Sequence, residues 1–118
     1  MAAVALNTFR TVRHVATNQS VGIYTAPIGV ASIVLFAQAV NLDEENVRFV
    51  TLSHARPQNP DGGDIVFQII NNGPVIPNDA LNLLNGRLVL ETNDELRVTG
   101  NTTGDVKVVI SILETAKS

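Results

Sequence analysis

The sequence has no cysteine and no tryptophan, and only 4% of its 118 residues are aromatic. Without cysteine, it has no disulfides, no thiolate nucleophile and no cysteine zinc site. No apolar run reaches the roughly 18 residues that a membrane-spanning helix needs, and the N-terminus lacks a basic region followed by a continuous apolar one. We therefore expect a soluble protein made without an export signal, with no membrane partner.

Charged residues are also few, and those of one sign do not gather. Eight basic residues against eleven acidic ones give a formal charge of −3, and the arginines and lysines are dispersed. A nucleic-acid partner is therefore not expected. The hydrophobic content of 45% predicts a packed core rather than disorder, and the length is that of one domain.

What the sequence does have is β-strand patterning. Apolar and polar residues alternate, Gly, Pro and Asn separate the runs, and helical periodicity is almost absent. We expect strands at 21–27, 30–40, 47–53, 65–70, 80–84, 87–91, 95–100 and 106–115. Seven to eight short strands predict an all-β fold, a single antiparallel β-sandwich or jelly-roll-like domain over residues 21–118. Residues 1–20 form an N-terminal segment, either an extended arm or a first strand, although a helical start is an alternative.

Three segments carry more specific predictions. Asn85-Gly86 is a strong two-residue hairpin signal, so 80–84 and 87–91 are expected to pair with each other. Residues 54–64, with two prolines and paired glycines, are expected to form a long loop. The run 30–40 has apolar residues at both odd and even positions. We therefore expect either a central strand buried on both faces or a strand packed against another subunit.

No constellation of residues predicts catalysis or metal binding. His14 and His54 lie far apart in the sequence, without the spacing that brings two ligands onto one face. Ser53 precedes His54, but adjacent strand residues point to opposite faces. The carboxylates at 43–45 and 91–95 fall in predicted turns, where solvated charges are the usual interpretation. We expect no enzyme, no metal and no cofactor.

Three stretches resemble a known family. They are "IYTAPIGVASIVLFAQAVN", "VIPNDALNLLNGRLVLETNDELRV" and "DVKVVISILE", and together they are similar to small β-sandwich virion proteins of tailed bacteriophages. The resemblance runs from Ile23 to Glu114, except for 54–70. In the acidic turn, Asn93 stands where glycine is usual, a mild change because Asn also tolerates positive φ.

The resemblance implies a virion structural protein, assembled in the cytoplasm of a host bacterium. The favoured role is a capsid decoration or cement protein that oligomerises, as a trimer, and contacts the major capsid protein or other virion proteins. A neck, tail or fibre-attachment protein is the alternative. A carbohydrate-binding module is a further alternative, disfavoured because such sites stack sugars on aromatic rings, which this chain has few of.

If the sandwich strands are committed to the core, partner contacts fall to the N-terminal segment and the 54–64 loop. Arg10 and Arg13, three residues apart, are suited to bidentate contact with carboxylates of a partner. The residues predicted to contact a partner are Phe9, Arg10, Arg13, His54 and Arg56.

Overall fold

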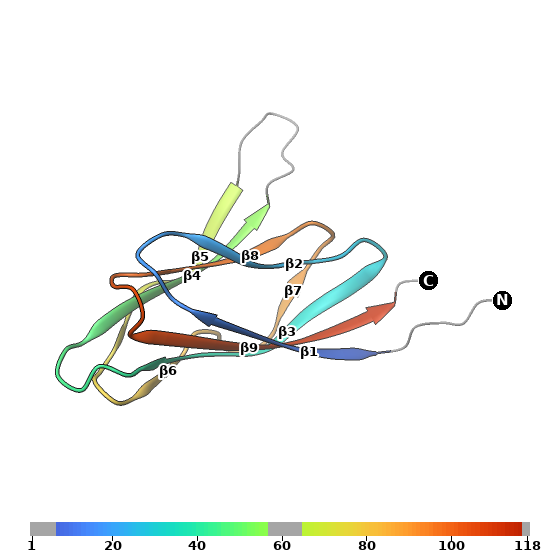
Figure 1. The fold of residues 1–118 in the computed structure, drawn as a ribbon. Helices are drawn as coiled ribbons and strands as arrows, with labels where there is room; N and C mark the ends of the chain where they lie inside the picture. Colours follow the sequence, from blue (N-terminus) through green and yellow to red (C-terminus); the bar gives the residue numbers. More distant parts are fainter. Residues whose placement is uncertain (1–6, 57–64, 117–118) are drawn as a thin grey trace.

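The structure, a computed structural model, describes residues 7–56 and 65–116, which form β-strands joined by turns (Figure 1). In chain order the strands are β1 (Thr8–Val15), β2 (Val21–Thr25), β3 (Val30–Asn41), β4 (Arg48–Arg56), β5 (Ile65–Val75), β6 (Ala80–Asn82), β7 (Leu88–Leu90), β8 (Glu95–Gly100) and β9 (Val106–Ala116).

The nine strands form two antiparallel sheets. In the first, sheet A, the order is β1-β9-β3-β6, with β7 also paired to β3. In the second, sheet B, the order is β2-β8-β4-β5. The predicted all-β antiparallel sandwich is therefore confirmed. The described chain has more strands than the expected seven to eight because residues 8–15 add β1 along the edge of sheet A.

Strand β9 lies in the middle of sheet A, between β1 and β3, and shows the predicted alternation most clearly. Val106, Val108, Ile110 and Ile112 are at most 1% exposed, and they line the core between the sheets. From sheet B, Leu52, Leu96 and Val98 pack against them. The core is thus built from alternate residues of strands that are far apart in the sequence.

Strand β3 explains why the run 30–40 is apolar on both parities. Before a register shift between Val34 and Phe36, the even-numbered residues, including Val34, face the core; after it, the odd-numbered residues, including Ala37 and Ala39, do. The shift turns Phe36 outward, where it is 41% exposed. Apolar residues on the other side of β3, such as Ile33 and Phe36, therefore lie on the outer face of sheet A and are not fully buried within the described chain.

The hairpin predicted at Asn85-Gly86 is wrong. Strands β6 and β7 do not pair with each other; both pair antiparallel with the same edge of β3, β6 opposite 38–40 and β7 opposite 32–34. Only Gly86 of the Asn-Gly pair has positive φ, at 86°, whereas a type I′ turn requires it at both positions. Strands β6 and β7 therefore lie one after the other along the same edge of β3, separated by residues 83–87, which are not part of a strand.

The loop predicted to start at His54 is also wrong at its beginning, because β4 continues to Arg56, opposite Ile65 at the start of β5. The rest of that loop, 57–64, lies outside the described residues. Strand β5 runs on to Val75, past the predicted strand end at residue 70, and includes Pro74. A proline is tolerated there because β5 is the outermost strand of sheet B. The paired ends near Arg56 and Ile65 project from the body as a two-stranded ribbon (Figure 1).

Candidate functional site

The five predicted contact residues fall into two groups that the structure does not bring together. Phe9, Arg10 and Arg13 lie on β1, at the edge of sheet A, and His54 and Arg56 lie on β4 in sheet B. Within β1 the side chains alternate. Phe9, which is 73% exposed, and Arg13 share the outer face of sheet A, whereas Arg10 stands on the core side, opposite Ile112.

Arg10 takes part in a polar link between the two sheets. Its Nε lies 2.9 Å from Oε1 of Glu114, whose side chain is only 9% exposed. The hydroxyl of Tyr24, from sheet B, donates to the other oxygen of Glu114 at 2.5 Å and lies 2.9 Å from the Ser32 hydroxyl. Burial, together with the bond to Glu114, raises the pKa of Tyr24 to about 12, and the same bond lowers the pKa of Glu114. Arg10 is therefore engaged within the chain.

His54 and Arg56 converge on Asp94, whose side chain is fully buried. Arg56 donates to both carboxylate oxygens, from Nε at 2.8 Å and from Nη2 at 2.9 Å. Nε2 of His54 lies 2.8 Å from Oδ2, and the backbone N–H of Glu91 donates to the same oxygen at 2.8 Å. The interpretation of residues 91–95 as solvated turn charges is thus wrong for Asp94.

Burial by itself raises the pKa of Asp94, because an ionised carboxylate loses its hydration. The hydrogen bonds from Arg56, from the Glu91 backbone and from His54 outweigh it and hold the pKa at about 2. Asp94 also raises the pKa of Arg56. The buried carboxylate is therefore ionised at neutral pH, and it fixes the ribbon of β4 and β5 to the turn between β7 and β8.

Above this cluster the ribbon forms a small hollow of about 230 Å³, lined by His54, Arg56, Ile65 and Phe67. Phe67 is 68% exposed and lies opposite His54 across the ribbon. The hollow is smaller than the pockets that usually hold small ligands. Its exposed aromatic ring beside a guanidinium is instead typical of protein contact surfaces.

The strand register places several apolar residues on the outer face of sheet A. Residues directly opposite in antiparallel strands point to the same side. One row of such residues crosses four strands, and its members are Phe9, Leu113, Ile33 and Val89. Phe9 and Val89, at its two ends, are 73% and 58% exposed. Phe36 lies on the same face. In the sequence, this face was indicated by the run 30–40, which has apolar residues at both odd and even positions.

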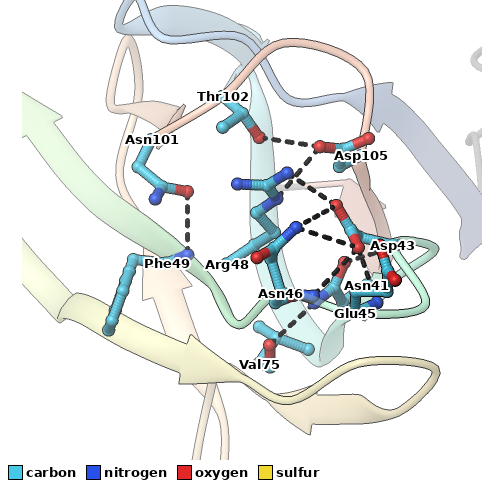
Figure 2. A network of polar contacts seen from close by, with 10 residues as sticks. All are labelled: Asn41, Asp43, Glu45, Asn46, Arg48, Phe49, Val75, Asn101, Thr102 and Asp105. Carbon is cyan, nitrogen blue, oxygen red and sulfur yellow. Dashed lines mark hydrogen bonds and ion pairs between the residues drawn. The ribbon is translucent and has the colours of Figure 1, made fainter.

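The opposite end of the sandwich from the ribbon is closed by a polar network (Figure 2). The amide of Asn41 donates to the carbonyls of Asn46 and Val75, both at 2.9 Å. Asp43 accepts backbone N–H bonds from Glu45 and Asn46, and these bonds lower its pKa. Arg48 joins this turn to the turn between β8 and β9. Its Nη2 lies 2.6 Å from Asp43 and its Nε lies 3.0 Å from Asp105. These charges hold the turns together.

The described residues offer no arrangement that predicts catalysis. Although His54 and Asp94 are paired, no serine hydroxyl within 7–56 or 65–116 hydrogen-bonds to His54, and Ser53 points to the opposite face of β4. Over the same ranges no three His, Asp or Glu side chains gather in a way that would hold a metal ion. Nor do these ranges contain a helix of the length and hydropathy needed to cross a membrane.

Comparison with known proteins shows a fold. Neither protein-family models nor curated proteins match the sequence. Among solved structures, the chain is similar to a chain of the T13 IBDV viral particle, with a TM-score of 0.53 and 11% identity. That match covers 98% of this chain and 32% of the viral one, so the chain spans only a part of it.

Two further similar structures match over nearly their whole length. A chain in the capsid structure of Helicobacter pylori bacteriophage KHP30 has a TM-score of 0.54 at 10% identity, covering 98% of this chain and 92% of that one. A Bacillus endospore appendage protein, from a family of disulfide-linked pili, has a TM-score of 0.51 at 12% identity, covering 100% and 96%. At such identities the shared property is the β-sandwich architecture.

Proposed function

We propose that this chain is a non-enzymatic structural protein of a bacteriophage virion and that it decorates the capsid exterior as a cement protein. The observation that carries the proposal is the outer face of sheet A, where an apolar row lies across four strands with exposed ends. Exposed apolar patches of this kind mark contact sites. The sequence resemblance to small virion proteins of tailed phages supports the same role, as does the fold shared with a chain of a phage capsid structure.

The mechanism of such a protein is mechanical. A symmetric oligomer, here a trimer, sits where major capsid subunits meet and buries apolar area on several of them at once. Each single contact is weak, but linked contacts act together and become strong. Phe9 on sheet A and Phe67 on the ribbon are exposed side chains that serve this contact.

The first test is the number of copies per particle, measured by quantitative mass spectrometry of purified virions against the major capsid protein. A ratio approaching one chain per capsid subunit supports a cement protein distributed over the shell. On the order of ten copies would overturn that position and favour the neck, tail or fibre attachment, where symmetry limits the number of sites. Absence from the particle would refute both structural roles.

The second test addresses the surface itself. Phe9→Ser combined with Val89→Ser removes apolar side chains from both ends of the row, and we expect capsid binding at least about tenfold weaker. The matched control is Ile28→Ser, which removes an apolar side chain that is 80% exposed in the turn between β2 and β3 and does not belong to the row. Circular dichroism checks that all variants keep their β-sheet content. Equal binding of the double variant and wild type would refute the assignment of this face.

A further inference from the structure

The outer face of sheet A carries charge of one sign only, although the chain as a whole is acidic. The register places on this face alternate residues of β1 and β9, together with outward residues of β3, β6 and β7. The ionisable side chains among these strand residues are Arg13 and Lys107, both exposed. Neither makes an ion pair within the described part of the chain.

The two cations border a hollow of about 520 Å³ at the edge of sheet A. Its lining is Thr11, Arg13, His14, Val15, Lys107, Val108 and Val109, and we call it the basic hollow. His14 pairs with the core residue Val108, and its Nε2 is buried without a hydrogen-bond partner. Val15, 45% exposed, adds apolar surface. The hollow thus combines two unpaired cations with apolar walls, which suits a partner that brings carboxylates next to apolar side chains.

A surface of that composition occurs on the same chain. The turn after β3 carries Glu44 and Glu45, exposed and without an ion pair in the described residues, next to Leu42, which is 48% exposed. The turn before β6 lies beside it, since the N–H of Asn78 donates to the carbonyl of Asp43 at 3.2 Å. That second turn adds Ile76, 54% exposed, and Asp79. We call the set Leu42, Glu44, Glu45, Ile76 and Asp79 the acidic end.

We propose that the basic hollow of one copy binds the acidic end of a second copy. Charge decides between this contact and a symmetric one. If two copies met through the same face, two surfaces whose ionisable strand residues are all cations would lie against each other and repel. A contact between two different patches is heterologous, and such contacts close into a ring when the rotation between copies permits it. The inference rests on the self-association in the proposed function and assigns its residues.

The test uses charge reversal with exchange. One variant, Arg13→Glu with Lys107→Glu, makes the hollow acidic, and the other, Glu44→Lys with Glu45→Lys, makes the end basic. We expect each alone to self-associate at least about 100-fold more weakly than wild type, because like charges then face each other. An equimolar mixture of the two should associate again, at least into pairs that contain one copy of each variant, since the acidic hollow of one then fits the basic end of the other. Analytical ultracentrifugation measures the masses, against 12.6 kDa for the monomer.

Matched controls reverse charges elsewhere. Arg87→Glu alters an exposed cation beside β7, and Glu91→Lys alters a carboxylate whose side chain is 72% exposed. Both should keep the association of wild type. Added salt should weaken the wild-type contact, because exposed charges are screened.

The outcomes separate the two proposals. If wild type associates but both reversed variants do so equally well, or if their mixture stays monomeric, the assigned surfaces are wrong and self-association stands. If wild type is a monomer at every concentration, self-association itself fails, and the contact fails with it. Virion copy number, measured independently, then still decides whether the chain is a virion component.

Discussion

Replacing Asp94 with asparagine tests the buried carboxylate that fixes the ribbon of β4 and β5 to the turn between β7 and β8. Asparagine keeps the shape and one acceptor oxygen but removes the charge that Arg56 and His54 contact. In the folded protein the pKa of Asp94 is lowered from 3.8 to about 2. A shift of that size corresponds to about 2 kcal/mol of stability at neutral pH. The side chain is fully buried, so solvent screening does not reduce this value.

The pH dependence gives the reasoning a second test. Because the folded-state pKa lies below the unfolded one, the contribution of Asp94 is complete above pH 3.8 and is lost as the pH falls through about 2. The stability difference between wild type and Asp94→Asn should therefore be full at neutral pH and close near pH 2. Urea unfolding followed by circular dichroism measures both curves.

The control is Glu91→Gln in the same turn. The Glu91 side chain is 72% exposed and 3.5 Å from Arg56, so its loss should change stability by less than about 0.5 kcal/mol. Equal stability of Asp94→Asn and wild type at neutral pH would refute the reasoning. A gap that stays constant down to low pH would refute it as well, because it would show a packing effect rather than the loss of a charge.

Two further predictions concern the seam between the sheets and the sheet edge. Tyr24 is the only tyrosine in the chain, so its pKa can be measured by an absorbance titration. The midpoint should be about 12 in the folded protein and near the ordinary tyrosine pKa of 10.0 in the urea-unfolded chain. A folded midpoint near the ordinary pKa would contradict the buried hydrogen bond to the carboxylate. Gly73→Ala should destabilise the fold by about 1 to 3 kcal/mol in urea unfolding, because the added Cβ would lie 2.5 Å from Ile70 and 2.9 Å from Leu81. Gln68→Ala on the exposed part of β5 is the control, and an equal effect of both changes would argue against the clash.

The strands could be predicted because burial imposes a local period. In β9, alternate residues from Val106 to Ile112 face the core, and that alternation is visible in the sequence without knowing any neighbour. The positive φ of Asn93, 70°, was likewise expected from a turn that usually takes glycine. Local patterns thus sufficed for elements whose environment changes with every second residue.

The pairing of β6 and β7 could not be predicted in this way. An Asn-Gly pair signals a turn, but whether the flanking strands pair with each other depends on what else competes for their edges. Here β3 is long enough to accept both, with Gln38 opposite Asn82 and Ser32 opposite Leu90. Strand β3, which pairs with both, lies at least 40 residues earlier in the chain, beyond the range of any local sequence pattern.

The environment of Asp94 was missed for the same reason. Its own segment reads as a polar turn, and its burial depends on Arg56 and His54, which are 38 and 40 residues away in the sequence. Those two side chains had been predicted as partner contacts on a loop. Because β4 extends to Arg56, both side chains contact Asp94 from a strand; Arg56 is still 46% exposed, next to the exposed Phe67, and a partner contact there stays a prediction.

The central position of β9 has a consequence for synthesis. While the ribosome is still making the chain before Val106, β1 and β3 have emerged, but the strand that joins them does not yet exist. Arg10 meets Glu114 across 104 residues of sequence. Before β9 emerges, β6 and β7 can pair with β3, but β1 has no partner in sheet A and the other edge of β3 is open to other chains. Correct folding of the nascent chain therefore requires that β9 be synthesised soon after the earlier strands. Ribosome pausing upstream of β9 should favour aggregation over assembly.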